Sequence, residues 1–510
     1  MEKIKKNNFL KIASFIFLLS VFLFICLNKF NNDPRLSYKY TYYAIPISIS
    51  NTVGNDYSYT QFDNIRKNII NESHALERDE LNQLINLSFT QQPTGAHAAA
   101  VPGAEDLGLV DFVTYSFFLF GNEKDSIFKF YLLIFITSFL IFFFQFKNKN
   151  EFYLFSISYL GALILFNENF IWHHPSVPTE RFTDNRNFSL LGIIPYMHLS
   201  FYLFFEIKNK IRNIVLLTSQ IIILNFIIFC RSSIVLEATI ILSLIIILII
   251  LKYLKSNQNF SNFIKDFDNS FKVNLSVLLL FCLILMPNIN KIFLKHVYSE
   301  FTGERHPTIV MLRAGLMFDN PKLKKKYDFV FNNTQMNIDL AINDSGLKFY
   351  NEFYNKNNNK KEIFFPSGGV NIVEQRKMEI SFIIHLILND SLELIKNFVY
   401  YKPLAIFNAF KTEMQNYETE TNFLKVLVFM TIFFIFLLLK IKIMISIKLF
   451  LLTIAPVTIK NLLFWGLAHV YFFDLFIIYI CGGLLLIYIL TYLFKKLIIK
   501  KIIKNDSIAH

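Results

Sequence analysis

Long apolar runs alternate with polar segments along the whole of this chain. Crossing roughly 30 Å of hydrocarbon takes about 20 apolar residues in a helix, and the runs predict about ten such spans. Each run is expected to be helical because lipid offers no hydrogen-bond partners to an open backbone. The spans are expected near residues 9–28, 127–146, 152–170, 188–206, 214–230, 234–254, 273–290, 423–441, 449–467 and 474–494.

Lysine and arginine concentrate in every second gap between the apolar runs. Residues 147–149, 208–212 and 440–448 are examples, and the C-terminal tail is also basic. Basic residues favour the cytoplasmic side during insertion, so this alternation predicts that both termini are cytoplasmic. It also places two large polar segments, residues 29–126 and 291–421, on the outer side of the membrane.

The predicted fold is an all-α integral membrane protein with two extracytoplasmic, mainly helical inserts. Residues 107–120 are apolar but too short to span, and we expect them to form an interfacial helix on the outer leaflet. Helices are also expected at 308–318, 374–388 and 392–398. The predicted segments are a first transmembrane helix (1–28), an outer loop (29–126), spans two to seven (127–290), a helical cap (291–421), and spans eight to ten with a basic tail (422–510).

Composition narrows the classes of protein that remain. With 54% hydrophobic residues and a mean hydropathy of +0.42, the chain is not a soluble protein of ordinary composition. The net charge of +13 does not indicate nucleic-acid binding, because the basic residues are spread over short loops and the tail. Four cysteines without paired spacing argue against a disulfide framework or a zinc site. Residues 9–27 follow three lysines without a small-residue cleavage motif, which favours an uncleaved first span.

A cluster of carboxylates stands at the start of the expected interfacial helix. Glu105, Asp106 and Asp111 lie within seven positions of one another. Carboxylates at a lipid–water boundary can act as a general base or hold a divalent cation. A Mg²⁺ or Mn²⁺ ion would suit them chemically, although their spacing indicates no defined ligand set. The alternative is that they stabilise the start of a helix.

Several cationic residues on the predicted outer side are candidates for phosphate binding. A guanidinium group matches a phosphate bidentately, and arginines in outer loops run against the orientation rule. Lys460 lies within an apolar run, where charge is costly and often functional. The alternatives are an arginine that reaches lipid head groups, a structural histidine, and pairing of Lys460 with Asp474. The candidates are Arg181, Arg186, Arg231, Arg305, His306 and Lys460, with Arg313 and Asp319 close to His306 in sequence.

The layout of spans and loops resembles the membrane glycosyltransferases of the C superfamily. In that family a long first outer loop carries surface-lying helices and an acidic catalytic residue, and residues 29–126 occupy this place here. The resemblance implies a sugar donor linked to polyprenyl phosphate, used at the outer membrane surface. Glu105 or Asp106 would be the matching acid.

A second resemblance is local. His306-Pro307, Gly315-Leu316, Phe318 and Asn320 are similar to a pattern in uncharacterised polytopic bacterial proteins found with surface-polysaccharide genes. Residues 383–411, with Asp390, Pro403 and Lys411, also look similar, whereas Thr308-Ile309-Val310 departs from the pattern. This resemblance implies the cytoplasmic membrane of a bacterium and a role in the assembly of envelope glycans.

These features lead to one function hypothesis and two alternatives. The hypothesis is a glycosyltransferase in which Glu105 or Asp106 deprotonates the acceptor while Arg181 and Arg186 neutralise the leaving phosphate. Its partners would be membrane lipids and a polyprenyl-phosphate-linked saccharide. One alternative is a flippase for lipid-linked saccharides, although the spans hold few of the charges that a polar path needs. The other is a non-catalytic envelope assembly protein that binds partners through residues 291–421.

Overall fold

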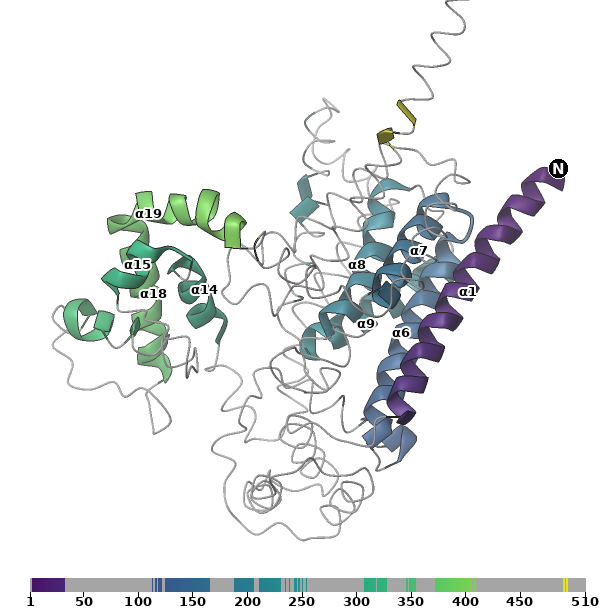
Figure 1. Cartoon of the computed structure of the whole chain (residues 1–510), viewed down its shortest axis with the longest axis horizontal. Coiled ribbons are helices and arrows are strands. Elements are labelled where there is room, and N and C mark those ends of the chain that lie inside the picture. Colours follow the sequence, from purple (N-terminus) through teal and green to yellow (C-terminus); the bar gives the residue numbers. More distant parts are fainter. Residues whose placement is uncertain are drawn as a thin grey trace, which may run out of the picture. The chain divides into compact units, whose positions relative to one another are not determined.

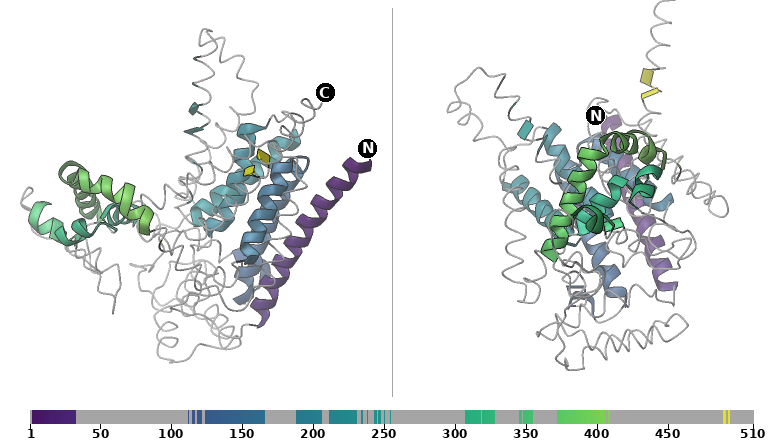
Figure 2. Two further views of the ribbon diagram at one scale, coloured as in Figure 1. Left: turned by 45° about the horizontal axis from the view of Figure 1, so that its top comes forward. Right: turned by 90° about the vertical axis from the view of Figure 1, so that its left-hand side faces the viewer.

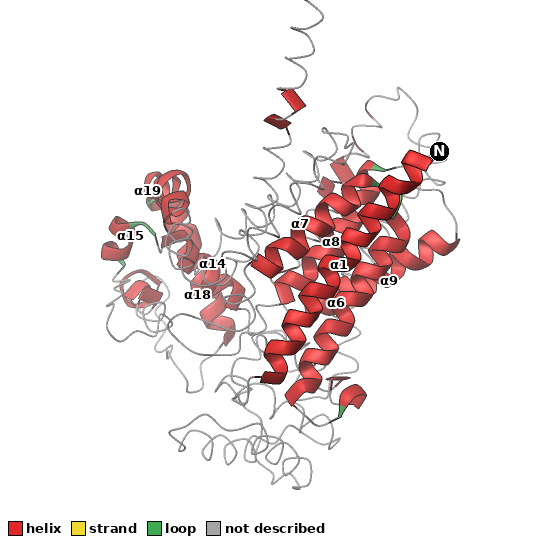
Figure 3. Cartoon of the chain, turned by 45° about the vertical axis from the view of Figure 1, so that its right-hand side comes forward, coloured by secondary structure: helices red, strands yellow, loops and turns green. Residues whose placement is uncertain are grey.

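The computed structural model consists of helices and short connections, and no strand occurs among the residues that it describes (Figure 1, Figure 3). The chain divides into two compact units. The described residues are 2–32, 112, 115–116, 118–121, 124–165, 188–205, 211–230, 234, 238, 243–244, 246–247, 250, 254, 307–317, 319–327, 345–346, 348–354, 372–405, 408, 489–490 and 492–493.

The first unit is a bundle of apolar helices. Helix α1 packs on α7, α8 packs on α9, and α6 contacts both α8 and α9 (Figure 2). Within the described part of the chain, three stretches are long and apolar enough to cross a membrane: Phe9–Leu27, Ser126–Phe146 and Ile211–Ile228. The protein is therefore a helical membrane protein. The bundle comprises α1 (Glu2–Asn32), α6 (Lys124–Phe146), α7 (Asn150–Leu165), α8 (Phe188–Phe204) and α9 (Ile211–Cys230).

Helices lie at the positions of the first five predicted spans. Only isolated positions of the sixth and tenth predicted spans are described, and the seventh, eighth and ninth lie outside the described residues. The number of ten spans therefore stays a prediction. The segment boundaries and the sidedness of the two inserts stay predictions as well.

Phenylalanine rings join α1, α6 and α7. The ring of Phe15 lies 5.8 Å from Phe139 and 5.6 Å from Phe152, measured between centroids. Seven residues further along α1, the ring centroid of Phe22 lies 5.3 Å from that of Phe135. Rising numbers on α1 meet falling numbers on α6, so these two helices are antiparallel. Such ring pairs add about 0.5–1.5 kcal/mol each beyond the burial of their area.

A few polar side chains hold the apolar helices in register. Gln220 of α9 donates from Nε2 to Oγ of Ser138 on α6 at 2.9 Å. The hydroxyl of Tyr159 on α7 donates to the carbonyl of Leu190 on α8 at 2.6 Å. Hydrogen bonds between helices of this kind stabilise bundles in lipid, where apolar packing alone gives little specificity.

The second unit includes Lys291–Thr419 and contains shorter helices. Helix α14 packs on α18, which continues into α19 and η6. The helices expected at 308–318, 374–388 and 392–398 are thereby confirmed. Pro307 begins α14, a position where the missing proline N–H costs nothing. The elements are α14 (Pro307–Met317), α15 (Pro321–Lys326), η5 (Tyr350–Tyr354), α18 (Ile372–Asn389), α19 (Ser391–Lys396) and η6 (Asn397–Tyr401).

Candidate functional sites

An aromatic cluster marks one end of the first unit. The ring of Phe112 lies 4.7 Å from Phe130, 4.7 Å from Phe188 and 6.2 Å from Phe226, and Tyr115 lies 6.2 Å from Phe226. We call these five residues the aromatic junction. Phe130 lies near the start of α6, Phe188 starts α8, and Phe226 is near the end of α9. Three helix ends therefore meet around Phe112, which is fully buried.

The residues after Phe112 continue along the surface of the bundle. Residues 115–116 and 118–120 are helical, and the side chain of Phe118 is 84% exposed. Tyr115 and Leu119 are exposed as well. A short helix that is anchored by one buried ring and turns other apolar groups outward agrees with the expected interfacial helix.

Basic side chains gather at the opposite end of the same bundle. Lys149, three residues beyond α6, lies 4.7 Å above the ring of Phe205, just beyond the end of α8. At the start of α9, Arg212 donates to the carbonyl of Phe144 at 2.8 Å. Lys11 of α1 donates to Asn150 at the start of α7. Basic side chains thus lie at the end of the unit where α1 and α9 begin and α6 ends, and the side of the membrane that this end faces stays a prediction.

All nine candidate site residues lie outside the described residues: Glu105, Asp106, Asp111, Arg181, Arg186, Arg231, Arg305, His306 and Lys460. Three of them are close in sequence to residues of the aromatic junction. Asp111 directly precedes Phe112, Arg186 is two residues before Phe188, and Arg231 follows the last residue of α9.

A buried ion pair joins α14 and α18 in the second unit. Arg313 donates from Nε and Nη2 to the two carboxylate oxygens of Glu379, the second at 3.1 Å. Its Nη1 donates to Oγ of Ser345 at 2.7 Å, and its guanidinium lies 5.0 Å from the ring centre of Phe382. The two charged side chains are 0% and 1% exposed. Arg313 is therefore committed to an internal bidentate pair and is not a free phosphate ligand.

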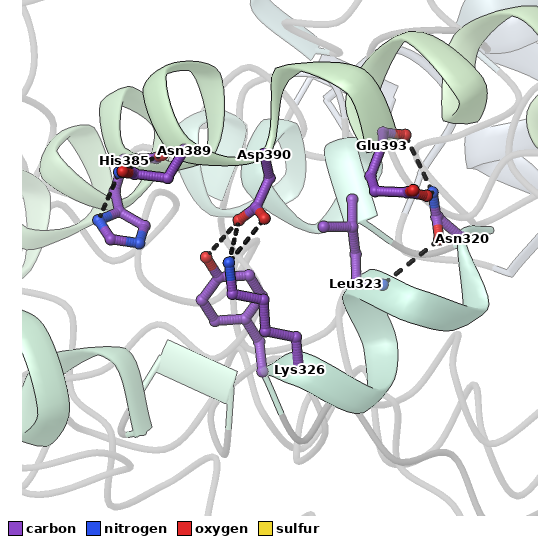
Figure 4. Close-up of polar contacts among 8 residues, drawn as sticks. Asn320, Leu323, Lys326, His385, Asn389, Asp390 and Glu393 are labelled. Atoms are coloured by element: carbon purple, nitrogen blue, oxygen red, sulfur yellow. Dashed lines mark hydrogen bonds and ion pairs between the residues drawn. The ribbon is translucent and has the colours of Figure 1, made fainter.

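A polar network surrounds Asp390 at the break between α18 and α19 (Figure 4). Lys326 Nζ lies 2.6 Å and 2.8 Å from the two carboxylate oxygens, and the hydroxyl of Tyr327 donates to Oδ2 at 2.6 Å. Burial raises the pKa of Tyr327 above its usual value, and the hydrogen bond to Asp390 adds to this effect. The phenol therefore stays protonated at neutral pH and remains a hydrogen-bond donor.

His385 lies one turn before Asp390 on α18, beside a group of aromatic rings. Its ring centroid is 4.6 Å from Phe353 and 5.3 Å from Phe349. Burial and, to a smaller extent, Lys326 lower the pKa of His385, while Asp390 opposes the change. The imidazole is therefore neutral at neutral pH, with Nδ1 3.2 Å from the amide nitrogen of Asn389.

Two asparagines join the segments that the local resemblance singled out. Asn320 caps α15 by accepting from the backbone N–H of Lys322 at 2.9 Å, and it donates to the carbonyl of Glu393 at 2.9 Å. Asn397 donates to the carbonyl of Leu316 near the end of α14 at 2.8 Å. A hydrogen bond from Lys396, with one from Asn320, lowers the pKa of Glu393. Residues 306–320 and 383–411 thus meet in one folded unit.

Sequence reasoning had named Asn320 and Asp390 but missed Lys326, Tyr327, Glu379 and Glu393. The partners in these contacts are separated by 63 to 73 positions along the chain. Local spacing carries no signal for such pairs. A joint change of charge at paired positions in related sequences is the kind of signal that could have found them.

Neutralising Asp390 is expected to loosen the contact between α15 and α19. In Asp390→Asn the charge facing Lys326 is lost, while an oxygen remains to accept from Tyr327. Because Lys326 is 45% exposed, we expect a loss of only about 1 kcal/mol in the unfolding free energy. Pulse proteolysis of the full-length protein over a urea series would measure it, with Glu352→Gln on η5 as an exposed control. Equal midpoints for the two variants would contradict the role given to Asp390.

Among the described residues there is no group of three or more histidine, cysteine, aspartate or glutamate side chains placed to hold a metal ion. The suggested Mg²⁺ or Mn²⁺ at Glu105, Asp106 and Asp111 concerns residues outside that part of the chain. The chain matches no protein-family model, no curated protein and no solved structure. The two resemblances therefore stay expectations drawn from the sequence.

Proposed function

We propose that this membrane protein transfers a sugar from a polyprenyl-phosphate carrier to an acceptor at the outer membrane surface, during assembly of a cell-envelope glycan. The observation that supports the proposal best is the aromatic junction. It brings together the helix ends next to Asp111, Arg186 and Arg231, which come from three separate parts of the sequence. We propose that the acid and the two guanidinium groups act together there, because a transfer of this kind needs a base and positive charge for the leaving phosphate.

The proposed reaction is a displacement at the anomeric carbon of the donor sugar. A carboxylate of Glu105, Asp106 or Asp111 takes the proton of the acceptor hydroxyl, whose oxygen then bonds to the anomeric carbon. The bond from that carbon to the carrier phosphate breaks, and the phosphate leaves with the electron pair. Arg181, Arg186 and Arg231 neutralise its developing charge, which is where electrostatic stabilisation has its largest effect.

The remaining candidates take a secondary place in this proposal. Arg305, His306 and Lys460 belong to the second unit, and the contacts at the aromatic junction do not involve their chain neighbours. The basic end of the bundle, with Lys11, Lys149 and Arg212, fits a cytoplasmic orientation. We accordingly propose that the junction faces outward and that both termini are cytoplasmic, in the inner membrane of a bacterium.

The test uses the full-length protein in a host whose surface glycan depends on it. In Glu105→Gln/Asp106→Asn/Asp111→Asn we expect glycan formation to fall by roughly 100-fold or more, because every candidate for the general base is lost. Binding of polyprenyl phosphate to the purified variant in nanodiscs should be retained. In Arg186→Ala and Arg231→Ala that binding should fall, whereas Lys325→Ala, on the exposed side of α15, should leave it unchanged.

Three outcomes would count against the proposal. Normal surface glycan in a correctly inserted Glu105→Gln/Asp106→Asn/Asp111→Asn variant would exclude these acids as the base. Unchanged lipid binding in both arginine variants would exclude a carrier-phosphate site at the junction. Labelling of a cysteine at position 186 only from the cytoplasmic side, with a membrane-impermeant thiol reagent, would place the arginines on the wrong face.

A further inference from the structure

Exposed apolar side chains follow one another along α18 and again along α19 and η6. Within each of the two segments, before and after the break at Asp390, they recur every three or four positions, which places them on one side of that segment. Leu388 and Val399 are each 74% exposed. We call these side chains together the outer stripe, which consists of Ile384, Ile387, Leu388, Leu392, Ile395 and Val399.

The carboxylates of Glu379, Asp390 and Glu393 on the same helices lie on the opposite, protein-facing side. Glu379 pairs with Arg313 of α14, Asp390 with Lys326 of α15, and Glu393 accepts from Asn320. Figure 4 shows Asp390 and Glu393 directed toward α15. A helix on the surface of a soluble protein has the reverse pattern, with charges outward and apolar groups inward. Outward apolar groups together with internal ion pairs suit a helix whose outer face meets lipid.

Among the described residues of the second unit, the exposed charges are mostly basic. The carboxylates of Glu379, Asp390 and Glu393 are only 1%, 10% and 19% exposed. Glu352 on η5 is an exposed exception. The described lysines that are exposed or partly exposed are Lys322, Lys324, Lys325, Lys326, Lys348, Lys377 and Lys396. Of these, Lys377 lies on α18 itself, and its positive charge complements the anionic head groups of a membrane surface.

We propose that the outer stripe lies in the lipid of the same membrane that the apolar helices of the first unit cross, at the boundary between head groups and acyl chains. The bilayer is always within reach, because the second unit is part of a chain anchored by those helices. Tyr400, exposed beside Val399, is a residue type that favours this boundary. The assignment goes beyond the proposed transferase activity and does not depend on it.

Tryptophan fluorescence in brominated lipid tests this assignment on the full-length protein. The chain has two tryptophans, Trp172 and Trp465, which are first replaced by phenylalanine. Ile387→Trp then reports on the outer stripe, and Lys325→Trp on the exposed side of α15 is the matched control. In proteoliposomes with bromine on the upper acyl chain, we expect emission from position 387 to be blue-shifted and quenched about twofold or more. Emission from position 325 should be red-shifted and nearly unquenched.

Each other outcome overturns the proposal. Red-shifted, unquenched emission from position 387 would place the outer stripe in water. Blue-shifted emission without quenching would show that protein covers it, either another segment of this chain or a second copy. Val399→Trp provides a second reporter on the same face if Ile387→Trp fails to fold, as judged by resistance to proteolysis.

Discussion

Replacing Glu379 by Gln or Arg313 by Met is expected to destabilise the second unit by about 3–5 kcal/mol, because either change leaves the partner buried without its counter-charge. Both side chains are almost fully enclosed, so water cannot take the place of the missing partner. In Arg313→Met, Ser345 also loses a donor at 2.7 Å. The loss is comparable to a large part of the total stability of a small folded unit.

The double variant Arg313→Met/Glu379→Leu separates packing from charge. With both charges removed and similar volumes retained, we expect most of the lost stability to return, since buried ion pairs can often be replaced by apolar residues at little cost. Urea midpoints from pulse proteolysis of the full-length protein provide the measurement. Single variants within about 1 kcal/mol of the parent would contradict the burial and pairing described for these residues.

The helices could be predicted from the sequence because their signals are local. Uninterrupted apolar runs account for α1, α6, α7, α8 and α9, since an apolar segment of that length has few other stable forms in lipid. In the second unit, Pro307 marks the start of α14 and Asn320-Pro321 marks its end, whereas α15, which begins at Pro321, is not among the expected helices. Each of these signals depends on adjacent residues alone.

The contacts between helices could not be predicted in the same way. Arg313 is close to the candidate residue His306 in sequence, yet in the fold it binds Glu379, 66 positions away. The meeting of Phe112, Phe188 and Phe226 likewise depends on how three helices pack. In a chain with 60 phenylalanines, no single ring is marked out by composition. Contacts of this kind join residues that are far apart along the chain, so they produce no periodic pattern in the sequence.

The stability of the second unit is expected to rise between about pH 8 and pH 9.5, because of Lys402. This lysine is almost fully buried, and burial lowers its pKa to about 8 from the usual 10.5, with Asp319 opposing the change. Between these two values the folded state releases a proton that the unfolded state keeps. Stability therefore increases with pH across that window, by about 1–2 kcal/mol at pH 9.5 relative to pH 7.

Other groups nearby change stability with either sign, so a variant of Lys402 is needed to isolate its effect. Burial raises the pKa of Asp319, so the stability it contributes is lost as pH rises through that pKa, which is opposite in sign to the effect of Lys402. The raised pKa of Tyr327 opposes the trend only above pH 10, near the usual tyrosine value. Lys324, whose pKa burial also lowers, changes stability in the same direction as Lys402.

Lys402→Met is the variant that isolates this effect. The substitution keeps a side chain of similar length beside Phe398 but removes the titrating ammonium group. The rise in stability between pH 8 and pH 9.5 should therefore become markedly shallower. Lys325→Met, at an exposed position of α15, should keep the slope of the parent protein. Urea midpoints measured at several pH values compare the three proteins. Parallel slopes for all of them would mean that Lys402 is hydrated in the folded state, against the burial that the packing of η6 implies.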